Sequence, residues 1–91
     1  MAIVMRFTPQ AMNAAKYDEV IRRLEAAGAG APAGRLYHVC FGDKENLRVS
    51  DIYDSRENFE EFGKTLMPIL QDVGVDPGQP EFFEVHNIIK G

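Results

Sequence analysis

The feature that most constrains the fold of this chain is the segment from Arg35 to Ser55, where two runs of largely apolar residues flank a short polar turn. We predict a β-hairpin with its turn at residues 43–46. Counting outward from that turn gives four cross-strand pairs: Gly42 with Leu47, Cys40 with Val49, His38 with Asp51, and Leu36 with Tyr53. Strand side chains alternate between two faces, so these residues share one face. The hairpin therefore places a histidine and a carboxylate together among apolar side chains.

Two stretches with a helical spacing of apolar residues flank the hairpin. The first is predicted to begin at Pro9, with Thr8 as its N-cap. Its apolar stripe consists of Met12, Tyr17, Val20, Ile21 and Leu24. The second is predicted to begin after the N-cap Ser55 and to end at Gly74, with a kink or break at Pro68.

Short apolar runs from Ile3 to Phe7 and from Glu81 to Ile89 add a first and a last strand. The order of elements is then β-α-β-β-α-β. This order predicts an α+β fold of the ferredoxin-like split βαβ type, with a four-stranded antiparallel sheet and two helices on one face. With 91 residues, a single domain spanning residues 1–91 is expected.

The predicted strands are apolar on both faces, although two helices can cover only one of them. A domain of this size also buries only about 60 to 65% of the surface of its unfolded chain, so its core is thin. Exposed apolar faces mark interaction surfaces. We therefore expect a homodimer in which the sheets of two subunits pack face to face as a dimeric α/β barrel.

Composition argues against several classes of function. The net charge is −4 and the basic residues are scattered, so neither nucleic acid nor an anionic membrane is an expected partner. The N-terminal apolar run stops at Arg6, and the lone Cys40 suits a reducing compartment, which together predict a cytoplasmic protein. Two histidines and one cysteine show no metal-ligand spacing, and no nucleotide-binding glycine motif occurs, so we expect neither metal nor other cofactor.

The hairpin supplies the candidate catalytic residues His38, Asp51 and Tyr53. A carboxylate that accepts from one imidazole nitrogen fixes the tautomer and makes the other nitrogen a better proton acceptor, as a general base requires. The Tyr53 phenol could hydrogen-bond a substrate oxygen. A structural role is the alternative, with Asp51 held by Arg35, Arg48 or the backbone. The pairing depends on the turn, because a turn one residue longer or shorter places His38 and Asp51 on opposite faces.

The candidate ligand-binding residues are His86, Phe59, Phe62 and Met67. His86 lies in the last predicted strand and shares a cavity with His38 if both strands face the helices in the same way. Alternatively, it is a strand histidine near an edge or a dimer seam. The other three belong to the apolar stripe of the second helix, and such stripes are more often core than ligand site. Cys40 is expected to be a small core residue rather than a nucleophile.

The stretch LRVSDIYDSRENFEEF, residues 47–62, joins a strand that ends in an aromatic residue, a short Asp-Ser cap and a helix that begins with phenylalanine. Through this stretch, and over nearly its whole length, the chain resembles the dimeric α/β-barrel superfamily. The nearest branches are the antibiotic-biosynthesis-monooxygenase-like proteins and uncharacterised small bacterial proteins. The resemblance implies two ferredoxin-like subunits, each with a pocket between its sheet and helices. Members oxidise polyphenols without a cofactor, degrade haem, isomerise lactones or only bind small molecules.

This chain departs from the haem-degrading branch at two positions. The strand tryptophan of that branch is replaced by Tyr53, and no histidine occurs between Arg56 and Val73. The resemblance therefore favours a homodimer that binds a small aromatic or lipophilic molecule and acts as a cofactor-independent monooxygenase-like enzyme. The alternative is a ligand-binding or stress-response module without enzymatic activity, in which His38 and Asp51 are structural.

Overall fold

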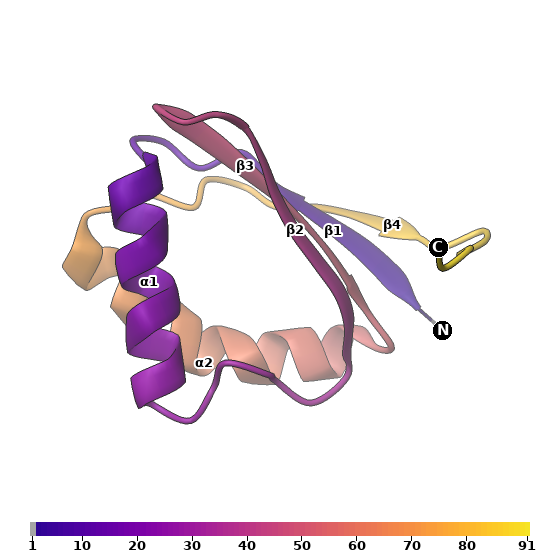
Figure 1. The fold of residues 1–91 in the computed structure, drawn as a ribbon. Coiled ribbons are helices and arrows are strands. Elements are labelled where there is room, and N and C mark those ends of the chain that lie inside the picture. The colour runs from indigo at the N-terminus through magenta and orange to yellow at the C-terminus, as the bar shows by residue number, and fades with distance from the viewer. Residues whose placement is uncertain (1) are drawn as a thin grey trace.

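The computed structural model describes residues 2–91, and these form four strands and two helices in the predicted order. The elements are β1 (Ile3–Phe7), α1 (Ala14–Ala26), β2 (Arg35–Asp43), β3 (Asn46–Tyr53), α2 (Arg56–Val73) and β4 (Glu81–Glu84). The strands form one antiparallel sheet in the order β2-β3-β1-β4. Both helices lie on the same side of this sheet (Figure 1). The predicted α+β ferredoxin-like arrangement is confirmed.

Helix α1 begins later than predicted. Its N-cap is Asn13, whose side-chain oxygen accepts a hydrogen bond from the backbone nitrogen of Lys16 at 2.8 Å. The residues between Thr8 and this cap dock on the hairpin instead. The backbone nitrogen of Leu47 donates to the Met12 carbonyl at 2.8 Å, and the Met12 side chain is buried. The predicted start is wrong because this tertiary contact holds the segment outside the helix.

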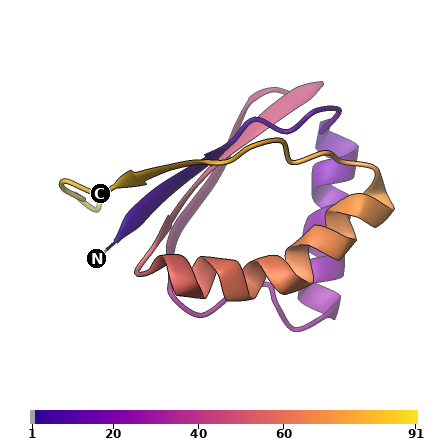
Figure 2. The ribbon, with the colours of Figure 1, turned by 180° about the vertical axis from the view of Figure 1, so that it is seen from behind.

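Helix α2 has the predicted ends. Ser55 caps its first turn, and Gly74 ends it in the left-handed conformation at a φ of 86°, which favours glycine. Pro68 lies inside the helix, which bends and does not break (Figure 2). Phe62 and Leu70, on either side of the proline, are both buried, so both halves of the helix face the core.

Strand β4 is shorter than the strand predicted from Glu81 to Ile89. It pairs with β1 from Glu81, opposite Arg6, to Glu84, opposite Ile3. Beyond Glu84 the chain has passed the start of β1, and the Val85 nitrogen makes one more backbone hydrogen bond, to the Ala2 carbonyl at 3.0 Å. Residues 85–91 form no strand and curve into a hook at the edge of the sheet (Figure 1).

The hairpin of β2 and β3 has the predicted register near the turn. The confirmed pairs are His38 with Asp51 and Cys40 with Val49. The predicted pairing of Leu36 with Tyr53 is wrong, because the register shifts at a β-bulge and Arg35 lies opposite Tyr53. The extra residue, Leu36, is 46% exposed. The bulge thus brings a cation, where a leucine was expected, to the face that the helices cover.

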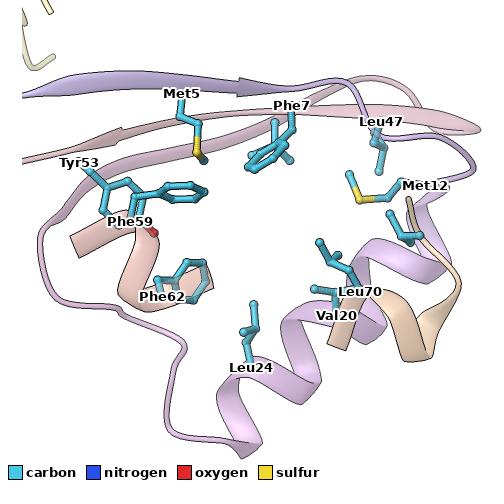
Figure 3. Close-up of a cluster of buried hydrophobic side chains, with 12 residues drawn as sticks. Met5, Phe7, Met12, Val20, Leu24, Leu47, Tyr53, Phe59, Phe62 and Leu70 are labelled. Carbon is cyan, nitrogen blue, oxygen red and sulfur yellow. The ribbon is translucent and has the colours of Figure 1, made fainter. Parts of the chain in front are cut away.

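The core lies between this inner face and the two helices (Figure 3). Its largest fully buried side chains are Tyr53 and Met5. The Tyr53 ring packs edge-on against Phe59 on α2, with 5.5 Å between ring centroids. Such contacts fix how the start of α2 sits on the sheet.

The outer face of the sheet carries no helix (Figure 2). Apolar side chains on this face remain accessible, with Tyr37 57% and Phe83 50% exposed. Among residues 2–91, no helix combines the length and the apolar character needed to cross a membrane.

Candidate functional site

The candidate site lies on the inner face of the hairpin, where β2 and β3 hold His38 and Asp51 opposite each other. His38 Nδ1 is hydrogen-bonded to Asp51 Oδ1. The Asp51 side chain is buried, whereas 24% of the His38 side chain is exposed. A buried carboxylate needs a hydrogen-bonded partner, and here the imidazole provides it.

Tyr17 on α1 extends this pair to a network of three residues. Its hydroxyl oxygen lies 2.7 Å from His38 Nε2, and the two rings are nearly parallel. A carboxylate can only accept, so the assignment that satisfies every group has His38 Nδ1–H donating to Asp51. His38 Nε2 then accepts from the Tyr17 hydroxyl. The network thus connects a helix to the sheet through a single histidine tautomer.

The phenol of Tyr17 is neutral near physiological pH. Burial raises its pKa above the ordinary value, and Cys40 and Asp51 raise this pKa further, while the charge of Arg35 opposes them. A neutral phenol can donate its proton to His38, as the network requires. Its oxygen keeps a lone pair that can accept a hydrogen bond from another molecule.

A cavity of about 60 Å³ lies beside the network, between the sheet and the helices. Tyr17, His38, Asp51 and Arg35 form its polar wall. The remainder of the wall is apolar and includes Phe7, Met12, Leu24, Phe62 and Leu66. This volume holds a few water molecules, whereas a cavity of about 150 Å³ accommodates benzene. An aromatic ligand would therefore require the surrounding side chains to move apart.

Tyr53, the third predicted catalytic residue, is fully buried and does not line the cavity. Its hydroxyl lies close to Phe59 and Phe62 (Figure 3) and makes no hydrogen bond to any residue that the structure describes. Burial raises the pKa of this phenol well above its ordinary value, with Asp51 adding to the shift and Arg35 opposing it. Tyr53 is thus a neutral polar group outside the network of Tyr17.

The predicted ligand-binding residues are separated in the structure. Phe62 lines the cavity, and Phe59 is a core residue in contact with Tyr53. Met67 and His86 are exposed, and neither lines the cavity. His86 lies past the end of β4, so within this chain it does not share a cavity with His38.

Two residues of the site, Tyr17 and Arg35, were not among the predicted catalytic or ligand-binding residues. The sequence places Tyr17 in the apolar stripe of the first helix, and its phenol, the only polar group in that stripe, is the signal that could have identified it. Arg35 gives no comparable signal. It reaches the cavity only because of the bulge at Leu36, and the sequence does not mark that bulge.

The site offers no metal-binding cluster and no activated thiol. Within residues 2–91, no group of three or more histidine, cysteine, aspartate or glutamate side chains could hold a metal ion. Burial raises the pKa of the Cys40 thiol, so the reactive thiolate form is disfavoured at neutral pH.

Fold and site together define a small ferredoxin-like protein with a cavity between its sheet and helices. No family model and no curated protein sequence matches the chain. Among solved structures, the chain is similar to SnoaB, a cofactor-independent oxygenase from Streptomyces nogalater. The TM-score is 0.62 and the identity 19%, over 99% of this chain and 96% of SnoaB.

Two further solved structures have the same fold. One is assigned as an antibiotic biosynthesis monooxygenase from Deinococcus radiodurans, with a TM-score of 0.62 and 14% identity over 99% of this chain and 97% of that one. The other is assigned as a monooxygenase from Shewanella loihica PV-4, with a TM-score of 0.57 and 18% identity over 96% of each chain. At these identities the likeness concerns the fold. It confirms, at that level, the predicted resemblance to antibiotic-biosynthesis-monooxygenase-like proteins.

Proposed function

We propose that this protein binds a small aromatic or lipophilic molecule in the cavity beside Tyr17 and oxidises phenols as a cofactor-independent monooxygenase-like enzyme. One observation carries the proposal. A hydrogen-bonded network runs from Asp51 through His38 to Tyr17 and ends at the wall of an otherwise apolar cavity. The description of SnoaB, a protein of the same fold, as a cofactor-independent oxygenase supports this reaction class.

In the proposed reaction the network removes the phenolic proton of the substrate. That proton passes to the Tyr17 oxygen while the Tyr17 proton moves to His38 Nε2, and Asp51 stabilises the imidazolium that forms. The electron-rich phenolate then reacts with dioxygen. One oxygen atom enters the ring as a second carbonyl, and the other leaves as water with two hydrogens of the substrate. A phenol and dioxygen thus give a quinone and water, with the substrate supplying all the electrons.

Oxygen uptake with 1-naphthol as the probe tests this proposal. We expect the protein to consume oxygen and, under ¹⁸O₂, to form labelled naphthoquinone. General acid–base groups contribute about 10² to 10⁴ in rate, so His38→Ala should slow turnover by at least about a hundredfold. The matched control is His86→Ala, which removes an exposed histidine outside the cavity. Unchanged oxygen uptake in a folded His38→Ala variant would eliminate His38 as the proton acceptor.

Binding without turnover is the second candidate, and a specific observation favours it. Both ring nitrogens of His38 are hydrogen-bonded within the chain, as in a structural brace between α1 and the sheet. In that case 1-naphthol should shift the NMR resonances of cavity residues without oxygen uptake. His38→Ala should then reduce the stability of the protein and change no reaction rate.

We also propose that two copies of the chain associate through the outer faces of their sheets. The uncovered face and its exposed Tyr37 and Phe83 support this arrangement. Sedimentation velocity at micromolar concentration should give the mass of two chains, and Tyr37→Glu should shift it toward one. The control is Lys64→Glu, a charge change on the exposed side of α2. A mass of one chain for the unaltered protein would contradict the dimer.

A further inference from the structure

Arg35 is the one lysine or arginine among the described residues that line the cavity. The bulge places it opposite Tyr53, on the face that the helices cover. The other long cation of the hairpin, Arg48, lies on the opposite face and packs over the Phe41 ring at 5.1 Å. The site thus combines one cation with a network that can accept a proton.

The guanidinium of Arg35 is only partly satisfied by the chain. Its Nη2 donates to the Gly30 carbonyl at 2.9 Å. No carboxylate of residues 2–91 lies within ion-pair distance of it, and the carboxylate of the cavity wall, Asp51, is paired with His38. A guanidinium has five N–H donors, so donors remain for another acceptor beyond Gly30 and the nearby Tyr53 hydroxyl.

The positive charge of Arg35 affects two phenols, the half-buried Tyr17 and the fully buried Tyr53. It lowers the pKa values of Tyr17 and Tyr53 against the larger, opposite effect of burial. Arg35 shares the cavity wall with the Tyr17 end of the network and lies opposite Tyr53 in the hairpin. A ligand that contacts Tyr17 in this small cavity is also close to the cation.

We propose that Arg35 binds a carboxylate of the ligand, so that the cavity selects aromatic acids. The planar fork of arginine matches a carboxylate in two parallel hydrogen bonds. Under the proposed function, on which this inference rests, the substrate is a phenolic acid. Its hydroxyl faces Tyr17 and its carboxylate faces Arg35.

Overall electrostatics cannot account for such a preference. The chain has a net charge of −4, so its summed field repels anions. A preference for an acid over its neutral isostere must therefore come from a local cation.

Benzoate and benzamide make a suitable pair of probes, because they share shape and ring but differ in charge. Each is titrated into ¹⁵N-labelled protein, and dissociation constants are taken from the shifts of Tyr17, His38 and Val49 amide resonances. We expect benzoate to bind about tenfold more tightly than benzamide, since hydrogen bonds between charged groups are about twice as strong as neutral ones. Arg35→Met should bring the two constants within about twofold of each other.

Two further variants complete the experiment. Arg35→Lys keeps the charge without the fork and should retain part of the preference, which also covers the case in which Arg35→Met does not fold. Arg48→Met removes the same charge from the outer face and should leave the preference unchanged.

Three results would overturn the inference. They are equal or tighter binding of benzamide by the unaltered protein, a benzoate preference that survives Arg35→Met, and no shift of cavity resonances with either probe. Failure of the proposed oxidation is a separate result. If the protein prefers benzoate but consumes no oxygen with 1-naphthol, the result supports the carboxylate site and contradicts the proposed catalytic role.

Discussion

Removing the same oxygen atom from two tyrosines should change stability in opposite directions. The Tyr53 hydroxyl is buried without a hydrogen bond to the described residues, whereas the Tyr17 hydroxyl is bonded to His38 Nε2 at 2.7 Å. An unsatisfied buried polar group costs about 1 to 3 kcal/mol. The void left by one oxygen costs roughly 0.5 kcal/mol, at about 24 cal/mol per Å³. Tyr53→Phe should therefore stabilise the fold by about 1 kcal/mol.

Tyr17→Phe should instead destabilise the fold by about 1 to 2 kcal/mol, because it removes one hydrogen bond and leaves His38 Nε2 without a donor. Urea unfolding followed by circular dichroism, at one fixed protein concentration, measures both changes. For a domain of this length, about 1 kcal/mol corresponds to a shift in Tm of roughly 4 to 8 °C. A loss of 1 kcal/mol or more in Tyr53→Phe would refute the reasoning and would show that its hydroxyl has a partner.

Three other predictions follow from the hairpin and the helix it joins. Gly34 has a φ of 82°, and a Cβ there would lie 2.8 Å from Asn58 Cβ, so Gly34→Ala should destabilise the fold by about 1 to 3 kcal/mol. Gly63 lies in an uncrowded position within α2, so Gly63→Ala should stabilise the fold by about 0.5 to 1 kcal/mol. Equal effects of the two substitutions in thermal unfolding would contradict this account. Burial raises the pKa values of Tyr17 and Tyr53, so above about pH 10 the unfolded chain loses its phenolic protons first. The free energy of unfolding is therefore unaffected by this titration below that pH and declines as the pH rises toward the folded-state pKa values. Tyr53→Phe should flatten this decline in urea unfolding between pH 9 and 11, and an unchanged slope would count against it. Asp51→Asn keeps the shape of the side chain, but the new amide can donate to His38 Nδ1, so the imidazole should change tautomer. The ¹⁵N chemical shifts of the His38 ring report the tautomer directly. An unaltered tautomer would show that Asp51 does not set it.

The sequence predicted the fold well because its signals were local. Ser55 and Gly74 mark the ends of α2 through their own cap chemistry. The pairing of His38 with Asp51 follows from counting residues outward from the turn, and the structure has that register. Each of these features depends on residues close together in the chain.

The errors lie where distant parts of the chain decide the outcome. The start of α1 is set by contacts of Met12 with the hairpin, which compete with the helix signal at Thr8. Strand β4 ends where its partner β1 begins, with Glu84 opposite Ile3, and the sequence of β4 does not indicate that limit. Among the site residues, Tyr17 reaches His38 only because α1 packs across the sheet. No local pattern in the sequence indicates these contacts between distant segments.

The bulge in β2 links the cavity wall to the outer face of the sheet, although a substitution on one of these surfaces need not affect the other. One extra residue decides that Arg35 belongs to the cavity and that Leu36 is exposed. Without the bulge, the simple alternation of the strand would place Leu36 opposite Tyr53 and turn Arg35 outward. Loss of the bulge would therefore alter the proposed ligand selection and the proposed subunit association in one step. Homologues that lack the bulge should differ in both properties together.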